Sequence, residues 1–250
     1  MKNVFKMSLV ACLLVSSLSS CYFDFDDDGR AEVFDSRCED GFGSTVTEDL
    51  RLDEFSGIEL RIDAQVFLSE GDELEVSVKG QQNIIDELET RVRNGVWEIE
   101  YDDCVRNSDV LRIFITAPNL NYIAVNGSGK IQSDDILEVN DLEIKNNGSG
   151  DIELSLQGDV VTARVRGSGK ISLEGVASTL DLDIRGSGDA ETFDLLVRDA
   201  QVEIDGSGDA QVHVSDFLEV MIDGSGDVYY KGEPDLKVTT RGSGKVFNAD

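Results

Sequence analysis

The stretch VEIDGSGDAQV, Val202 to Val212, places a Gly-Ser-Gly tripeptide between two runs in which apolar and charged residues alternate. The same tripeptide occurs seven times, at intervals of 21, 19, 19, 20, 18 and 18 residues, beginning at Gly127, Gly148, Gly167, Gly186, Gly206, Gly224 and Gly242. Self-similarity at a near-constant interval is typical of repeat architectures, in which each unit packs on its neighbours. The second half of the chain is therefore predicted to be a repeat protein.

The residues beside each tripeptide follow a pattern. An apolar and then a polar residue precede most of them, as in Ile204-Asp205, and a charged and then a small or apolar residue follow them, as in Asp209-Ala210. Because side chains alternate between the two faces of a strand, the apolar residues point to one side and the charged residues to the other. Glycine accepts the positive backbone angles that a sharp corner can require. Gly-Ser-Gly is thus predicted to be a corner between two strands.

The length of the repeat selects among all-β folds. A unit of 18 to 21 residues is too short for a four-stranded propeller blade, and the leucine pattern of a leucine-rich repeat is missing. The length suits one coil of a parallel β-helix, whose coils stack about 4.8 Å apart. An antiparallel meander is the main competitor, because Asp-Gly and Asn-Gly favour hairpins, but it needs a regular second turn that we do not find. An outer-membrane barrel is disfavoured, because the repeats hold only five aromatic residues.

The chain before the repeats is also rich in predicted strands. From about Asp49 to Val125, segments of four to eight residues alternate or run apolar, and only Asn83 to Val92 is predicted to form a short helix or a loop. No linker separates this part from the repeats. We therefore expect one domain over residues 49–250.

The N-terminal segment is predicted to be a lipoprotein signal peptide, residues 1–20. Lys2 and Lys6 precede an apolar stretch that is too short to span a bilayer, and Leu-Ser-Ser-Cys ends the segment at Cys21. This ending resembles a bacterial lipobox, so we expect Cys21 to carry acyl chains such as palmitate and to anchor the protein to a membrane. A plain signal peptide with an incidental cysteine is the alternative.

Residues 21–48 are predicted to be an acidic tether. Asp24, Asp26, Asp27 and Asp28 follow Cys21 closely. Such a run is either simply solvated or resembles the surface-export signal of lipoproteins in Bacteroidetes-type bacteria. We expect an outer-membrane lipoprotein, exposed at the cell surface if the second interpretation holds. In that oxidising setting, Cys38 and Cys104 are predicted to form a disulfide. Their spacing in the sequence alone does not show that they lie close together in space.

The chain is strongly acidic, with 51 acidic and 22 basic residues and a formal charge of −29. This charge argues against binding to nucleic acid or to an anionic membrane surface.

Charges follow the tripeptides in the order Lys130, Asp151, Lys170, Asp189, Asp209, Asp227 and Lys245. The first four alternate in sign and should attract one another, whereas the three consecutive aspartates should repel.

The aspartates around the last corners raise the question of a cation. Neighbouring coils bring together Asp205, Asp209, Asp223 and Asp227, and several carboxylate oxygens are suitable ligands for Ca²⁺. Calcium is therefore one interpretation of this cluster. Exposed carboxylates that splay apart and are screened by salt are the other. No further cofactor is expected.

Catalytic residues are not evident. The chain has one histidine, His213, which lies between two valines on the predicted outward face, and no metal-ligand spacing or nucleophile motif surrounds it. A polysaccharide lyase using bound calcium and a basic residue remains open, because Arg166, Arg185 and Arg241 flank an acidic region. The repeats lack the long loops that usually build such a groove.

Two segments and the serial tripeptides resemble one family. Over about residues 52–247 the chain is similar to the auto-transporter adhesin head GIN domain family. The similarity lies in the segments FSGIELRIDAQVFLSEGDELEVSVKG and LRIFITAPNLNYIAVNGSGKI and in the repeated Gly-Ser-Gly followed by Lys or Asp. The resemblance implies a right-handed parallel β-helix and brings no catalytic residues. We expect a non-catalytic, adhesin-like binding or structural module of the cell envelope, whose ligand is a surface glycan or a protein. A surface protein that binds or cleaves carbohydrate is the alternative.

Overall fold

A computed structural model describes residues 23–25, 31–33 and 38–250, which form two separate units. In the first unit, β1 (Phe23–Phe25) pairs antiparallel with β2 (Ala31–Val33). The predicted signal peptide, Cys21 and residues 22, 26–30 and 34–37 of the predicted tether lie outside the described residues. No helix in the described part of the chain has the length and apolar character needed to cross a bilayer.

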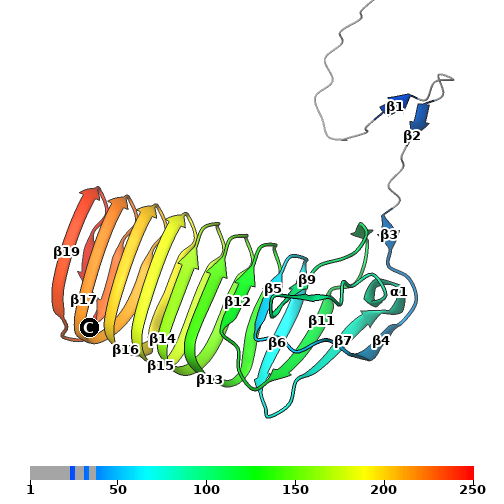
Figure 1. Cartoon of the computed structure of the whole chain (residues 1–250). Coiled ribbons are helices and arrows are strands. Elements are labelled where there is room, and N and C mark those ends of the chain that lie inside the picture. The colour runs from blue at the N-terminus through cyan, green and yellow to red at the C-terminus, as the bar shows by residue number, and fades with distance from the viewer. Residues whose placement is uncertain (1–22, 26–30, 34–37) are drawn as a thin grey trace, which may run out of the picture. The chain divides into compact units, whose positions relative to one another are not determined.

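The second unit is a parallel β-helix of about seven coils (Figure 1). Five long strands each follow almost one complete coil: β13 (Lys130–Asn146), β14 (Asp151–Val165), β15 (Lys170–Gly186), β16 (Asp189–Gly206) and β17 (Ala210–Gly224). Each strand pairs in parallel with the next. The last coils consist of β18 (Val228–Lys231), β19 (Asp235–Gly242) and β20 (Val246–Asn248). The predicted β-helix and the exclusion of a meander in the repeats are confirmed.

The N-terminal part of this unit combines parallel and antiparallel pairs. Its elements are β3 (Glu39–Asp40), β4 (Thr45–Leu50), β5 (Gly57–Leu60), β6 (Ala64–Glu70), β7 (Glu75–Gln81), α1 (Gln82–Ile85), β8 (Val92–Arg93), β9 (Val96–Ile99), β10 (Val105–Arg106), β11 (Leu111–Ala117) and β12 (Tyr122–Val125). β5, β12 and β13 continue the parallel stack, whereas β7 pairs antiparallel with β4 and β11. Of the segment Asn83 to Val92, expected to be a short helix or a loop, the first three residues belong to α1 and the last begins β8.

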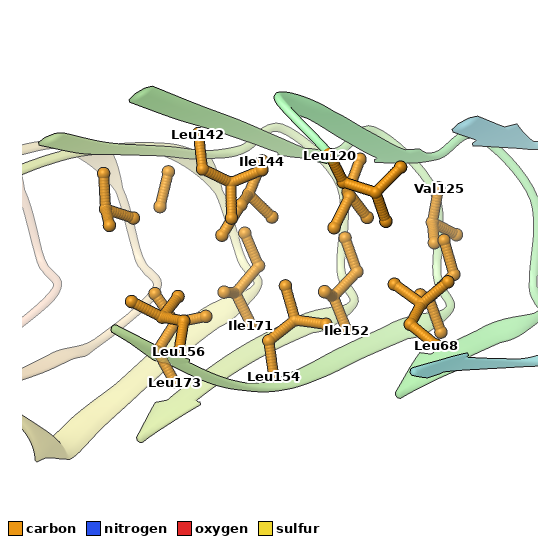
Figure 2. Packing of buried hydrophobic residues seen from close by; sticks show 14 of the residues in the cluster. Leu68, Leu120, Val125, Leu142, Ile144, Ile152, Leu154, Leu156, Ile171 and Leu173 are labelled. Carbon is orange, nitrogen blue, oxygen red and sulfur yellow. The ribbon is translucent and has the colours of Figure 1, made fainter. Parts of the chain in front are cut away.

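Each coil buries two short rows of side chains that face each other. In β14, Ile152, Leu154 and Leu156 are buried in the first half of the strand, and Val161 and Val165 are buried in the second half. Figure 2 shows both rows pointing into the same interior, with Leu142 and Ile144 on one side and Leu154 and Leu156 on the other. Apart from a register shift between β13 and β14, the register places most buried residues on buried residues of the next coil, so the core is a set of apolar columns.

The coil turns twice, although the sequence marks only one turn. Between the two buried rows of β14, residues 157–160 bend the chain, and the equivalent bend in β17 is Ser215–Phe217, where all three residues are exposed. These bends share no residue pattern, because exposed positions at a wide bend accept many side chains. The second turn of the coil was therefore not visible in the repeat.

The Gly-Ser-Gly corners stack closely on one another. The backbone N–H groups of Ser207 and Gly208 both donate to the carbonyl oxygen of Gly186, at 2.9 and 3.2 Å. A Cβ atom on Gly208 would lie 2.0 Å from the carbonyl oxygen of Gly188, so no larger residue fits there without displacing the backbone. Gly206 is constrained in two ways, because a Cβ atom there would lie 2.3 Å from the carbonyl oxygen of Gly186 and its φ angle is +150°, which L-residues rarely adopt. Close approach to the preceding corner therefore requires glycine at both positions.

Candidate functional site

A groove of about 450 Å³ crosses the outward face of the sheet that the first halves of β13 to β17 form. Its lining side chains come from successive coils and are mostly polar: Gln132, Ser133, Glu153, Ser155, Ser172, Glu174, Glu191, Phe193, Asp194, Gln211 and Lys231. Because this face points away from the apolar columns, its side chains are not required for the core. They are free to serve binding.

One outward row runs the length of this face. The register aligns Gln132, Glu153, Ser172, Glu191 and Gln211 on consecutive strands. The row continues to Phe67 and Phe114 at one end and to Tyr229 and Phe247 at the other. We call these nine residues the outward row.

The two ends of the outward row are aromatic. The rings of Phe67 and Phe114 stack at a centroid distance of 5.0 Å, and those of Tyr229 and Phe247 stack at 5.2 Å. The middle of the row offers carboxylate, amide and hydroxyl groups. The outward row therefore combines apolar ring faces with hydrogen-bonding groups along one straight line.

A β-bulge interrupts the sheet inside the groove. Between β15 and β16, one residue of β15 lies opposite two of β16, Thr192 and Phe193. Thr192 is buried, and its hydroxyl donates to the carbonyl oxygen of Gln211 at 2.6 Å. The ring of Phe193 consequently joins the groove lining, where the Nζ atom of Lys231 lies 4.4 Å from its centroid. Bulges often re-aim a side chain beside a functional site.

His213 belongs to the support of this bulge. Its Nδ1 atom lies 3.2 Å from the carbonyl oxygen of Phe193, and its side chain is half-buried on the outward face, as predicted. The imidazole thus satisfies a backbone group that the bulge withdraws from the sheet ladder. This contact gives the single histidine of the chain a structural partner.

The groove is acidic and only partly neutralised. The Nζ atom of Lys130 forms an ion pair with the carboxylate of Glu153 at 2.6 Å, and that of Lys170 forms one with Glu191 at 3.0 Å. The hydrogen bond to Glu191 raises the pKa of Lys170. Among the described residues no ion pair reaches Glu174, which instead accepts a hydrogen bond from the hydroxyl of Ser155. The groove can accept hydrogen bonds from hydroxyl or ammonium groups, and it repels anions.

The aspartates that follow the corners form a ladder with the backbone. The Oδ1 atom of Asp189 accepts the N–H of Asp209 at 2.9 Å, Asp209 accepts that of Asp227 at 2.7 Å, and Asp227 accepts that of Lys245 at 2.8 Å. A hydrogen bond from a backbone N–H to a carboxylate is stronger than one to a neutral acceptor. These hydrogen bonds offset the repulsion that the three like charges create.

The other two residues of the calcium hypothesis lie across the corner. Asp205 and Asp223 are neighbours in the register and are exposed, and Asp223 lies 3.8 Å from a guanidinium nitrogen of Arg241. Within residues 38–250, no group of three or more His, Cys, Asp or Glu side chains is arranged to hold a metal ion. The structure therefore gives the carboxylates of Asp209 and Asp227 hydrogen-bonding roles, and calcium binding stays a prediction.

The alternating charges pair differently from the simplest expectation. Lys130, Asp151, Lys170 and Asp189 are neighbours in the register, but the ammonium groups of Lys130 and Lys170 reach Glu153 and Glu191 instead. Long side chains extend beyond their own register position, so residue spacing alone did not identify the partner.

The arginines of the lyase hypothesis are not part of the groove. Arg185 pairs with Asp183 at 3.0 Å, and Arg241 lies near Asp223. Both belong to the second halves of their coils, as does Arg166 at the corner, whereas the groove lies on the first halves. The structure thus does not bring these bases to the acidic groove.

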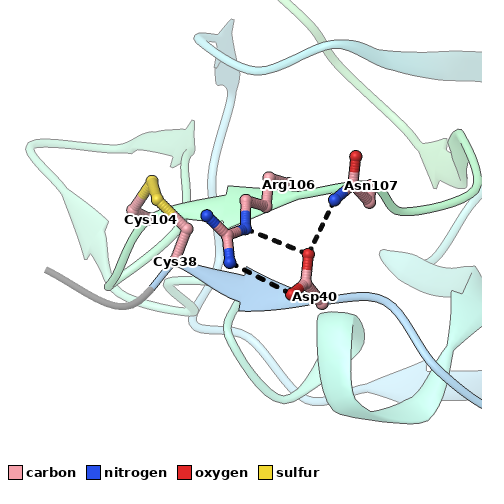
Figure 3. Close-up of a disulfide and its surroundings, with 5 residues drawn as sticks. All are labelled: Cys38, Asp40, Cys104, Arg106 and Asn107. Carbon is pink, nitrogen blue, oxygen red and sulfur yellow. Dashed lines mark hydrogen bonds and ion pairs between the residues drawn. A yellow bond between two sulfur atoms is a disulfide. The ribbon is translucent and has the colours of Figure 1, made fainter. Parts of the chain in front are cut away.

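Cys38 and Cys104 are joined by a disulfide beside the parallel pair β3 and β10 (Figure 3). Next to it, the guanidinium of Arg106 donates to Asp40 at 3.0 Å, and Asn107 donates at 2.8 Å. These two hydrogen bonds lower the pKa of the Asp40 carboxyl. The disulfide closes a segment of 66 residues, which corresponds to a loss of unfolded-chain entropy of about 4 kcal/mol.

Comparison with protein families places these features in context. The model of the family described as "Putative auto-transporter adhesin, head GIN domain" matches residues 54–234. The chain belongs to this GIN domain family. Adhesin is the family's description, and it indicates a protein of the cell surface or envelope. A comparison with curated proteins returned no match.

Solved structures share the fold of this GIN domain. A protein of Bacteroides fragilis described as a "putative adhesin" is 24% identical, with a TM-score of 0.80, and the match covers 84% of this chain and 99% of that one. A "putative lipid binding protein" of Parabacteroides distasonis is 24% identical, with a TM-score of 0.73 and coverage of 86% and 100%. A "putative adhesin" of Parabacteroides merdae is 21% identical, with a TM-score of 0.67 and coverage of 85% and 99%.

The aspartate ladder makes a testable prediction at Asp209. Asp209→Asn keeps an acceptor oxygen and removes one like charge, so we expect a melting temperature equal to or above that of the original protein. Asp209→Ala removes the acceptor of the Asp227 N–H, and we expect it to lower the free energy of unfolding by about 1 kcal/mol. Thermal unfolding followed by circular dichroism measures both effects. An Asn variant that is less stable than the Ala variant would contradict the ladder.

The same variants separate the ladder from the calcium hypothesis. If calcium binds, millimolar Ca²⁺ raises the melting temperature of the original protein, and the rise disappears in an Asp209→Asn, Asp227→Asn double variant. Equal melting temperatures with calcium and with a chelator at low ionic strength would leave the ladder as the only role of these carboxylates.

Proposed function

We propose that this GIN domain protein is a non-catalytic, lipid-anchored binding protein of the cell envelope, and that its ligand is an extended carbohydrate lying along the outward row. The observation that carries the proposal is the arrangement of that row, with stacked aromatic pairs at both ends and hydrogen-bonding groups between them. The Phe193 ring in the groove adds a further apolar face near its middle.

The chemistry of the row suits a sugar chain. Sugar hydroxyls donate to carboxylate and amide oxygens such as those of Glu191 and Gln211, and the C–H faces of a sugar ring pack on aromatic rings. The outward row of nine positions at about 4.8 Å per strand extends over about 38 Å. This length matches an extended polymer rather than a monosaccharide. The acidic lining favours neutral or amino sugars over uronic acids.

The non-catalytic assignment rests on the groups available in the groove. The one histidine holds the carbonyl oxygen of Phe193, and the arginines of the lyase hypothesis lie on the other half of the coil. The family and the structural neighbours are described as adhesins or a lipid binding protein and not as enzymes. These observations support binding.

A lipid anchor at Cys21 would hold this surface outside the cell. The lipobox-like ending at Cys21 and the acidic residues after it support attachment to the outer membrane through acyl chains, with the β-helix facing outward. An envelope position would expose the outward row to polysaccharides of the cell's surroundings.

Carbohydrate binding is tested with a neutral glucan, a glucosamine polymer and polygalacturonate. We expect the full chain to bind one of the first two and not polygalacturonate, and we expect Phe193→Ala to weaken binding about tenfold through the loss of ring stacking. Phe217→Ala is the matched control, because Phe217 is an exposed phenylalanine outside the groove. Titration calorimetry measures affinity.

Three outcomes would contradict this assignment. Binding to none of the polymers, or equal affinity of the Phe193→Ala and Phe217→Ala variants, argues against a carbohydrate on this face. New reducing ends released from a bound polymer would show that the protein cleaves its ligand and is an enzyme.

The lipid anchor is tested at Cys21. Without this thiol no acyl chain can be attached, so Cys21→Ala is expected to yield unprocessed or soluble protein instead of mature protein in the outer-membrane fraction. Fractionation followed by immunoblotting measures the distribution, with Cys12→Ala as the control. A Cys21→Ala protein found fully processed in outer membranes would show that the lipobox interpretation is wrong.

A further inference from the structure

The C-terminal end of the β-helix presents two unpaired strand edges. Among the residues that the structure describes, β19 pairs with β17 alone and β20 pairs with β18 alone. Figure 1 shows β19 as the outermost strand at this end, whereas α1, β4 and β7 lie at the other end of the unit. An open strand edge is a template for pairing with another strand.

The apolar columns are also open at this end. Leu236 and Val238 occupy the inward positions of β19 and are 42% and 43% exposed, although Leu218 and Val220 directly beneath them are fully buried. One more coil would bury them. Exposed inward residues beside an open edge indicate a surface that another β-structure can cover.

We propose that a second copy of this chain covers this end, with β19 of each copy pairing antiparallel about a two-fold axis at Val238. In this register Val238 meets its own equivalent, Leu236 meets Thr240 of the partner subunit, and Asp235 meets Arg241 of the partner subunit. The first two contacts continue the apolar column across the axis. The third forms two identical ion pairs, one on each side of the axis.

The charges of β19 select this register. A pairing centred on Lys237 would place two lysines opposite each other, and one centred on Thr239 would place Lys237 opposite a partner arginine. Both are repulsive. A shift by one residue would turn the inward side chains outward. The register centred on Val238 joins seven residues of each strand, keeps the faces in place and opposes unlike charges.

The interface closes on itself. A two-fold contact uses the same surface on both copies, so it produces a dimer and leaves no second β19 edge for further growth. The outward rows of the two copies then lie on one extended assembly. This inference is independent of the ligand proposed for the row.

A cysteine at the axis tests the dimer in the full chain. In the proposed register two Val238→Cys side chains face each other at the Cβ separation of directly opposed residues, which is close to disulfide geometry. We expect a disulfide-linked dimer on a non-reducing gel that disappears on reduction. Leu236→Cys is the control, because it faces Thr240 of the partner subunit, and it should remain monomeric. Only monomer from Val238→Cys, or equal cross-linking at both positions, would overturn the proposal.

Charge reversal tests the same interface without new cysteines. Arg241→Asp places an aspartate opposite Asp235 of the partner subunit on each side of the axis. We therefore expect the dimer to be lost in sedimentation measurements at physiological salt. Combining Asp235→Arg with Arg241→Asp should restore it. Lys237→Glu is the matched control. It removes an ion pair with Glu219, just as Arg241→Asp removes one with Asp223. Because residue 237 faces a threonine of the partner subunit, this variant should leave the dimer intact. A monomer at all concentrations, or a double variant without recovery, would contradict the interface.

Discussion

The close contact between successive Gly-Ser-Gly corners is the constraint on which the rest of the structure depends. The second glycine of each corner packs so tightly on the corner before it that a Cβ atom at Gly208 would lie 2.0 Å from the carbonyl oxygen of Gly188. The same contact recurs at Gly169, where the distance to Gly150 is also 2.0 Å. Because the corners stack directly, every coil begins in the same register, and equivalent residues form columns.

The columns divide the residues into two classes. Most inward residues, such as the buried Ile152 and Ile171, are apolar because their neighbours above and below are apolar. Outward residues are free of that requirement and can carry chemistry. The outward row and the aspartate ladder both use this freedom, and both run in a line because the corners stack directly.

The sequence predicted the parts of the fold that repeat. The corner glycines and the alternation around them indicated parallel coils, and the buried Ile184 and exposed Arg185 face as the pattern required. The second bend of the coil was missed because residues such as Ser215 and Asp216 occupy exposed positions that many residue types can fill. The antiparallel pairs of β7 were missed because the alternation of a strand does not report the direction of its neighbour.

The candidate site was mostly invisible in the sequence, although one signal was present. The hydrogen bonds of the aspartate ladder and the partners of Lys130 depend on side-chain conformation, which spacing does not give. The bulge at Thr192 and Phe193 did leave a trace, because the interval from Gly186 to Gly206 is 20 residues, one more than the preceding interval from Gly167 to Gly186. An extra residue in one coil of a regular stack marks a place where the sheet is distorted, and the groove lies there.

The central claim, that the stacked corners hold the coils in register, is tested most directly at Gly208. Gly208→Ala and Ser207→Ala each place an alanine in the same corner, but only the first adds a Cβ atom against the carbonyl oxygen of Gly188, whereas Ser207 is exposed. Denaturant unfolding followed by circular dichroism should show Gly208→Ala to be less stable by about 2 kcal/mol or more, with Ser207→Ala nearly unchanged. Equal stability of the two variants would contradict the account.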